Sequence, residues 1–356
     1  MLKILGIFIN FFNFRKKGIL SIYLVIFLNI EVIYLYMKCR NCGYENVNNA
    51  RFCRNCGSQL FQISHRKSGT SPLIKILAIV LVLLIAVLGS LAYVVFFDTS
   101  NVEIMQLSSS NSGNVLVNSE IASNIPDSKV SEMITNATNT GVPIYKIGDG
   151  DGPVSVIAAG VHGDQLVPSV AAMNMINYLD GRKIKGTVYI IPFTSPKAIS
   201  QNTKLTDGVN LNQAADDSGT VTNTLVNFCI ANNAGAVGDF HETQIGKDPG
   251  VTTIMCSEYP NYGSYQLANN MSSLSLDTTL TYLVAGVAYD GAVEDELNLK
   301  GTNAVTPLVQ VSSHGHVYQS AVEESYTQML ALLYVNGNLD PEDNYLKLAN
   351  MDIDGF

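Results

Sequence analysis

The sequence predicts an α/β domain over residues 141–356, in which a mixed, mostly parallel sheet lies between two layers of helices. The alternation of two kinds of segment predicts this three-layer class. Short apolar segments typical of strands alternate with longer amphipathic segments typical of helices. Alternation of this kind is characteristic of sheets that carry helices on both faces. The chain is also longer than one typical domain, so other segments precede this one.

Charge divides the chain into two parts. Residues 1–97 hold 11 Lys and Arg against two acids, whereas residues 98–356 hold 10 Lys and Arg against 28 Asp and Glu. An acidic second part with few basic residues argues against nucleic acid as a partner.

Residues 1–36 form a hydrophobic N-terminal segment, in which an apolar run follows Arg15, Lys16 and Lys17. One interpretation is a first transmembrane helix, which would make the protein two-pass. The other is that translation starts at Met37, so that residues 1–36 are a mis-assigned start. Both interpretations stay open.

Residues 37–60 carry the strongest local motif, two Cys-x-x-Cys pairs. Four thiolates at this spacing can close a tetrahedron around zinc, and the segment resembles the short zinc ribbons of many prokaryotic membrane proteins. Disulfides are less favoured, because the segment is predicted to face the cytosol, where thiols stay reduced. A closed site of this kind is structural or binds a partner, which the sequence does not identify. The four predicted ligands are Cys39, Cys42, Cys53 and Cys56.

Residues 73–97 are predicted to form a transmembrane helix. Residues 76–97 carry no charge, and 22 residues at about 1.5 Å each can span a bilayer core of about 30 Å. Basic residues precede this run and Asp98 follows it. The positive-inside rule then places the ribbon in the cytoplasm and the acidic domain outside the cell membrane.

Residues 98–140 are rich in Ser and Asn, with few aromatic residues. They are predicted to form a linker that holds the domain away from the membrane.

Within the domain, nine segments are assigned by their apolar pattern. Strands are predicted at residues 154–159, 187–191, 236–240, 252–255 and 308–311. Helices are predicted at residues 165–179, 220–234, 266–275 and 317–334. Ligands of such sheets gather at the carboxyl ends of the strands. His162 and His241 each follow a predicted strand, so the sequence predicts that they share one metal ion.

Three motifs surround these histidines: Gly-Val-His162-Gly-Asp-Gln165, then Asn-Leu-Asn212-Gln213, then Asp-Phe-His241. Their order resembles the succinylglutamate desuccinylase/aspartoacylase branch of the zinc carboxypeptidase superfamily, over roughly residues 141–335. The resemblance implies a carboxypeptidase-like fold and a zinc bound by a His-x-x-Glu pair and a later His. It also implies an Asn-Arg pair that grips the substrate carboxylate, and a glutamate that activates water.

The chain departs from this family at three positions. Gln165 stands where the liganding Glu is expected, Gln213 where the Arg is expected, and Gln310 where the catalytic Glu is expected. A glutamine oxygen is a neutral ligand that zinc rarely takes, and glutamine cannot accept a proton as a general base. Glutamine also lacks the bidentate fork of arginine. If Gln310 points at the metal, Gln310→Glu should restore a proton acceptor.

Other side chains near these motifs leave alternatives open. Glu242 either acts at the site, as a catalytic or ligand-orienting carboxylate, or lies exposed on a loop. His314 and His316 either supply a missing ligand or base, or are solvated. Asp207 and Asp239 are expected to cap turns or orient His162. Two further thiols either form a disulfide or stay separate, and these are Cys229 and Cys256.

Two functions are compatible with the sequence. The first is a membrane-anchored, extracytoplasmic, metal-dependent hydrolase that acts on an amide or N-acyl bond, such as that of a cell-envelope peptide. The second is a catalytically degenerate member that serves as an envelope binding or sensing module. Zinc is expected in the ribbon for both functions, and in the α/β domain for the first.

Overall fold

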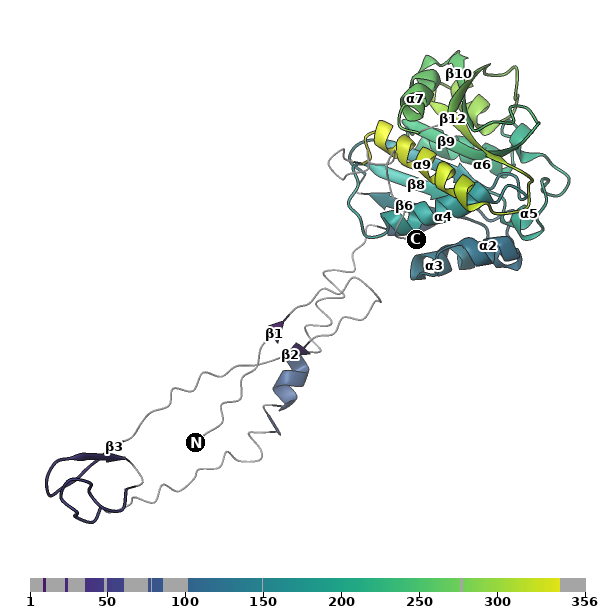
Figure 1. Cartoon of the computed structure of the whole chain (residues 1–356). Coiled ribbons are helices and arrows are strands. Elements are labelled where there is room, and N and C mark those ends of the chain that lie inside the picture. Colours follow the sequence, from purple (N-terminus) through teal and green to yellow (C-terminus); the bar gives the residue numbers. More distant parts are fainter. Residues whose placement is uncertain are drawn as a thin grey trace. The chain divides into compact units, whose positions relative to one another are not determined.

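The computed structural model of the chain describes residues 9–10, 23–24, 36–47, 50–60, 76–77, 79–85, 102–148, 150–275 and 278–339. The chain divides into two compact units, residues 1–85 and 86–356 (Figure 1). In the first unit, β1 (Ile9–Asn10) pairs antiparallel with β2 (Tyr23–Leu24). Apart from Tyr36, the rest of the hydrophobic N-terminal segment lies outside the described residues.

The ribbon begins with an antiparallel hairpin of β3 (Tyr36–Lys38) and β4 (Glu45–Val47). Its two Cys-x-x-Cys segments form the same turn twice. The amide of Gly43 donates to the carbonyl of Cys39 at 2.8 Å, and the amide of Gly57 donates to that of Cys53 at 2.9 Å. Both glycines have a φ of 73°, a left-handed conformation that costs glycine little. The repeat brings the four cysteines together.

The predicted transmembrane helix falls mostly outside the described residues. Residues 76–77 and 79–85 are helical, and their apolar side chains are exposed, from 42% at Val82 to 69% at Leu77. Over the described ranges, the structure contains no helix that combines the length and the apolar character needed to cross a membrane. A membrane span therefore stays a prediction.

The second unit is built on one eight-stranded sheet in the order β11-β10-β12-β9-β7-β8-β6-β5. Strands β12, β9, β7 and β8 are parallel neighbours, and β10 is parallel to β11. The β10–β12, β6–β8 and β5–β6 pairs are antiparallel. The strands are β5 (Val102–Ser108), β6 (Val142–Gly148), β7 (Val154–Ala159), β8 (Thr187–Ile191), β9 (Ala236–Gln244), β10 (Thr253–Tyr259), β11 (Thr279–Val284) and β12 (Ala304–Val311).

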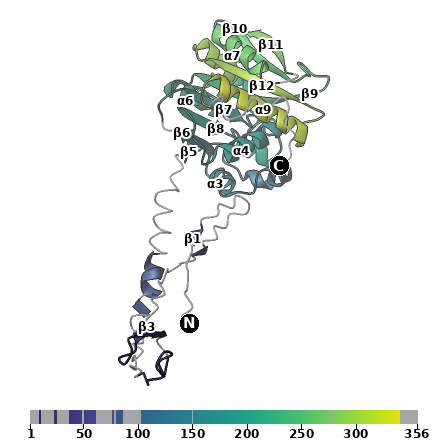
Figure 2. The same cartoon turned by 60° about the vertical axis from the view of Figure 1, so that its left-hand side comes forward.

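Helices cover both faces of this sheet, which confirms the three-layer α/β prediction (Figures 1 and 2). Alternate residues of β7 show the two faces. Ile157 belongs to one buried cluster, which includes α4, α7 and α9, and Val156 belongs to a second, which includes α6 and α8. The helices are α2 (Ser119–Asn124), α3 (Lys129–Ala137), α4 (Val167–Leu179), α5 (Pro196–Ser200), α6 (Val221–Ala231), α7 (Tyr262–Ser272), α8 (Val293–Leu299) and α9 (Gln319–Val335), with short 3-10 turns η1 (Val115–Val117) and η2 (Leu211–Gln213).

The linker predicted over residues 98–140 is wrong for residues 102–140, which belong to the α/β domain. They form β5, α2 and α3, and β5 is an edge strand paired with β6. The polar residues of this segment serve as helix caps: Asn118 accepts from the amide of Glu120, and Ser128 from that of Ser131. Four widely spaced aliphatic residues enter the core: Val115, Ile121, Val130 and Ile134.

Candidate functional site

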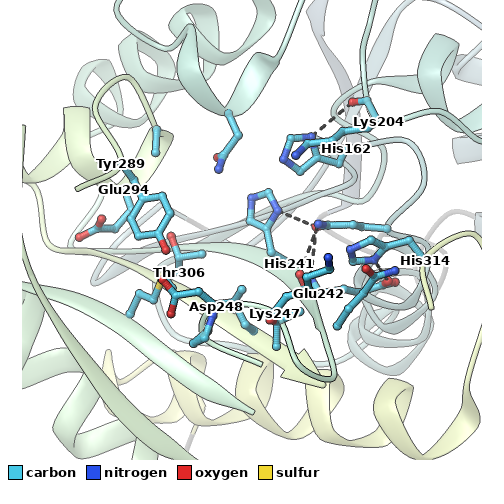
Figure 3. Close-up of a pocket in the computed structure, with 18 of the residues that line it drawn as sticks. His162, Lys204, His241, Glu242, Lys247, Asp248, Tyr289, Glu294, Thr306 and His314 are labelled. Carbon is cyan, nitrogen blue, oxygen red and sulfur yellow. Dashed lines mark hydrogen bonds and ion pairs between the residues drawn. The ribbon is translucent and has the colours of Figure 1, made fainter. Parts of the chain in front are cut away.

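A pocket of about 370 Å³ lies beyond the carboxyl ends of β7 and β9 (Figure 3). His162 follows β7, and His241 lies near the end of β9. Both histidines line the pocket, as the position of strand ends in parallel sheets predicts. Figure 3 shows His241 between the side that carries His162 and the side that carries Tyr289 and Glu294.

His162 is held on a tight turn between β7 and α4. Gly163 packs so closely against α5 that a Cβ there would lie 2.1 Å from the carbonyl carbon of Ala198, so only glycine fits. The Nδ1 atom of His162 lies 3.3 Å from the carbonyl oxygen of Lys204. Burial, with smaller contributions from the charges of His241 and Lys204, lowers the pKa of His162 to about 3. The ring is therefore neutral at physiological pH, which is the form that binds metals.

His241 is fixed on both sides by oxygen atoms. Its Nε2 lies 3.0 Å from a carboxylate oxygen of Asp239, which is two residues earlier and so on the same face of β9. Its Nδ1 lies 2.7 Å from Oε1 of Gln165. The backbone of Glu242 holds the Gln165 amide, donating to Oε1 at 3.1 Å and accepting from Nε2 at 3.3 Å. Gln165 therefore presents an oxygen, not its NH₂ group, to His241.

The structure brings the three predicted metal ligands together. The rings of His162 and His241 have centroids 5.3 Å apart, close enough to share one ion, and Gln165 contacts His241 directly. Each histidine also has one ring nitrogen beside an oxygen acceptor, as metal-bound histidines usually do. The arrangement fits a metal ion held by two imidazoles and an amide oxygen.

The charge of this donor set is lower than that of a His-x-x-Glu site. Over the described residues, only the ribbon cysteines form a group of three or more His, Cys, Asp or Glu side chains close enough to hold one ion. The third donor of the pocket is thus the neutral Gln165, and we expect metal to bind there more weakly than at a site with a carboxylate.

Of the two residues predicted to bind substrate, the structure places one in the pocket. Asn212 lines it, as does Lys204. Gln213 is exposed, and its Oε1 accepts a hydrogen bond of 2.8 Å from Asn210. The prediction for Gln213 is corrected, because η2 turns successive side chains in different directions.

Glu242 lines the pocket, but its carboxylate serves the packing of two elements. One oxygen accepts from the amide of Val167 at 2.7 Å and so caps α4, whose own N-cap residue makes no side-chain bond. The other lies 2.9 Å from Nδ1 of His314. Burial raises the pKa of Glu242, and the bonds to His314 and Val167 oppose this rise. Both carboxylate oxygens are engaged, which assigns Glu242 a structural role instead of the catalytic one predicted.

Gln310 does not reach the pocket, which corrects its predicted place at the catalytic position. Its Nε2 donates to the carbonyl of Gly250, and its backbone amide donates to Thr252 Oγ1 at 3.1 Å. Both partners belong to the loop between β9 and β10, and this loop contributes Lys247 and Asp248 to the pocket. Gln310 thus holds one wall of the pocket in place.

This contact reverses the expected effect of Gln310→Glu. A carboxylate would face the Gly250 carbonyl with no proton to donate, so we expect a loss of about 1 kcal/mol of stability and faster amide hydrogen exchange at residues 245–252. Gln213→Glu is the matched control, because Gln213 accepts a bond that a carboxylate also accepts. Unchanged exchange together with a gain in hydrolysis would support the original assignment.

The remaining predicted residues differ in their relation to the two central histidines. His316 is exposed and lies 3.6 Å from Glu120 of α2, and Asp207 pairs with Lys197 at 2.6 Å. Asp239 orients His241, not His162 as expected. Cys229 and Cys256 are both buried and free, so they form no disulfide.

The structure adds pocket residues that sequence patterns did not indicate. Lys204 and Lys247 bring positive charge, and Tyr289 and Glu294 lie across from His162 (Figure 3). Glu294 belongs to a run of three acids, Val-Glu-Asp-Glu296, which is typical of a solvated helix start. In the fold all three acids are buried. No local pattern distinguishes these two cases.

The ribbon cysteines form a structural zinc site. The sulfur atoms of Cys39 and Cys56 lie 3.6 Å apart and those of Cys42 and Cys53 lie 3.5 Å apart, with all four within 4.8 Å of one another. A tetrahedral zinc with bonds of about 2.3 Å places sulfur atoms about 3.8 Å apart. The geometry matches this value closely.

Two family models match separate parts of the chain. The zinc-ribbon domain matches residues 38–60, and the succinylglutamate desuccinylase/aspartoacylase catalytic domain matches residues 151–256. Both matches coincide with the segments whose motifs predict them. The second includes His162 and His241 and stops before Glu294 and Gln310. No curated protein sequence matches the chain.

Solved structures of related fold are similar to the α/β domain at low identity. A succinylglutamate desuccinylase from a Silicibacter species is 18% identical, over 57% of this chain and 63% of its own, with a TM-score of 0.47. The ectoine utilisation protein EutE from Ruegeria pomeroyi is 15% identical, over 58% and 64%, with a TM-score of 0.48. A metallo-carboxypeptidase from Burkholderia cenocepacia is 12% identical, over 71% and 67%, with a TM-score of 0.47. The chain thus spans less than two thirds of the first two structures.

Proposed function

We propose that the α/β domain is a metal-dependent hydrolase that acts on an amide or N-acyl bond. The observation that carries this proposal is the convergence of His162, Gln165 and His241 in one pocket, with Asp239 behind His241. A bound divalent metal would act as a Lewis acid on an acyl carbonyl and on water. The match of residues 151–256 to a catalytic-domain family supports the same reaction class.

The chain's own residues have separate tasks in this proposal. Asp239 and the Lys204 carbonyl hold the two imidazoles in fixed orientations, so that little reorganisation is needed when a metal binds. Asn212 and Lys204 line the same pocket and can offer an amide and an ammonium group to an anionic part of the substrate.

Metal binding by the full-length protein tests this site. We expect one tightly bound zinc at the ribbon and a second, weaker one in the α/β domain. His162→Ala or His241→Ala should abolish only the second, without unfolding the domain, whereas Cys39→Ser should affect only the first. Gln165→Glu should raise the zinc affinity of the second site by at least roughly tenfold. Replacing a residue that only supports a ligand already changes metal affinity by roughly this factor, and here the ligand itself is replaced.

The readouts are metal content and cobalt absorption spectra, followed by hydrolysis of N-acetyl and N-succinyl amino acids. A single metal per chain, unchanged in Gln165→Glu, would remove the hydrolase proposal.

A second function, a binding module without catalysis, is favoured by the position of Gln310. The residue at the expected catalytic position clamps a loop and lies outside the pocket lining. If this function holds, the pocket should bind small carboxylates or amides in isothermal titration, and purified protein should leave N-acyl amino acids intact at every metal concentration.

We further propose that the protein is anchored in the cell membrane, with the ribbon in the cytoplasm and the hydrolase outside. The uncharged run of residues 76–97 and the basic residues before it support this proposal, as do the exposed apolar side chains of residues 79–85. A cell-envelope peptide or N-acyl compound would then be the accessible substrate. Protease added to intact cells should remove the α/β domain and spare the ribbon, and protection of the domain would contradict this orientation.

A further inference from the structure

A buried carboxyl group on α8 lines the same pocket as the two histidines. Glu294 is only 2% exposed. Its Oε1 accepts hydrogen bonds from Ser257 Oγ at 2.8 Å and from the side-chain amide of Asn298. Asn298 is itself held by the carbonyl of Ala304 at 3.0 Å. One oxygen of Glu294 is thus fixed by the protein, and none of the hydrogen bonds found for this residue uses the other.

The surroundings of Glu294 favour its neutral form. Over the described residues, no Lys, Arg or His forms an ion pair with it. Burial, with smaller contributions from Asp295 and Asp239, raises the pKa of Glu294 to about 8, although the hydrogen bonds from Ser257 and Asn298 oppose the rise. At neutral pH the carboxyl group therefore keeps its proton.

Polar and titratable groups around Glu294 lie on β9, β10, α8 and two neighbouring loops. They are Asp239 of β9, Cys256 and Ser257 of β10, Asp295 and Asn298 of α8, and the pocket residues Lys247, Asp248 and Tyr289 of the two neighbouring loops. Both Lys247 and Lys204 line the pocket, so an anionic ligand finds positive charge there as well.

We propose that Glu294 is a hydrogen-bond donor of the pocket, which recognises a carboxylate or carbonyl oxygen of the ligand. The neutral carboxyl group gives its proton to a hydrogen bond from the oxygen that Ser257 and Asn298 leave unused. When Glu294 ionises, this donor becomes a negative charge that repels the ligand oxygen. Ligand binding is then strong at neutral pH and is lost in alkaline solution. The inference rests on the proposed function only in that the pocket binds an oxygen-bearing substrate.

Isothermal titration of the full-length protein with succinate tests this role between pH 6 and pH 9.5. Above the pKa of Glu294, affinity should fall about tenfold per pH unit. Glu294→Gln keeps a neutral donor and the acceptor for Ser257, so it should bind succinate at neutral pH and lose the alkaline decline. Glu296→Gln is the matched control, because Glu296 is also buried on α8 but pairs with Lys300 and lies outside the pocket lining. It should behave like the wild type.

Carrying out the titration first without added zinc separates this inference from the hydrolase proposal, since the alkaline decline should be present without a metal in the pocket. In parallel, carbon NMR of labelled glutamate side chains should show one carboxyl group that titrates near pH 8 and disappears in Glu294→Gln. No succinate binding at pH 6, an alkaline decline that persists in Glu294→Gln, or titration of Glu294 near the ordinary pKa of glutamate would overturn the inference.

Discussion

Removal of zinc is expected to unfold the ribbon completely, which is the largest effect that the structure predicts. The apolar core of this segment consists of Cys39, Cys53 and Leu60, with Met37 and Ala50 packed against it. A core of this size cannot offset the conformational entropy of its chain, so the metal must supply the folding free energy. Structural zinc sites of this kind contribute about 10–16 kcal/mol.

A peptide of residues 37–60 tests this expectation directly. Under reducing conditions it should be disordered in NMR spectra, and one equivalent of zinc should fold it. Cys42→Ser should prevent folding. In the full-length protein, Cys229→Ser is the matched control, because it changes a buried thiol of the α/β domain and should leave zinc content unchanged. A metal-free reduced peptide with a structured spectrum would contradict the prediction.

The second large effect concerns the dependence of stability on pH, which Glu294→Gln should change. Glu294 has a pKa of about 8 in the folded protein, against an ordinary value of 4.5. As pH rises from 4.5 to 8, the unfolded chain releases this proton while the folded chain keeps it, so the free energy of unfolding falls. Above pH 8 both states are ionised and the loss is complete. Linkage sets this loss at several kcal/mol, to order of magnitude.

Glu294→Gln should therefore be close to the wild type in stability near pH 4.5 and more stable than it by several kcal/mol above pH 8. Urea denaturation of the two proteins across this range measures the difference. Glu296→Gln should show no such increase with pH, because it removes a carboxylate that is paired with Lys300 in the folded protein. A constant difference between Glu294→Gln and wild type would mean that Glu294 is ionised in the folded state.

The sequence was sufficient for the centre of the sheet and for the central pair of histidines. Strands β7 and β8 match their predicted bounds, because buried parallel strands are continuous apolar runs with clear ends. Edge elements were not predicted. Strand β5 lies in a segment whose Ser- and Asn-rich composition is typical of a linker, and it is stabilised by residues distant in the sequence, through pairing with β6 and packing against α6. His162 and His241 were placed correctly because His162 follows β7 and His241 lies near the end of its parallel neighbour β9.

The rest of the site depends on contacts that no local pattern contains. Gln310 lies on the predicted strand, which pairs with β9, but its side-chain amide donates to the carbonyl of Gly250, which lies in a loop 60 residues away in the sequence. Glu242 faces the helices instead of the metal ligands, because adjacent residues of a strand point to opposite faces. Glu294 is buried because α8 packs against β10 and β12. The acidic sequence of α8 is typical of an exposed helix and does not indicate this packing.

The order of the strands also determines when the domain can fold during synthesis. Strand β12 lies between β9 and β10, so the β10–β11 pair joins the rest of the sheet only through the last strand that the ribosome delivers. Until residues 304–311 have emerged, both β9 and β10 have an open edge with unpaired amide and carbonyl groups. The nascent chain therefore exposes two open strand edges from the time β10 emerges until β12 follows, and a chaperone that covers strand edges would protect it during that interval.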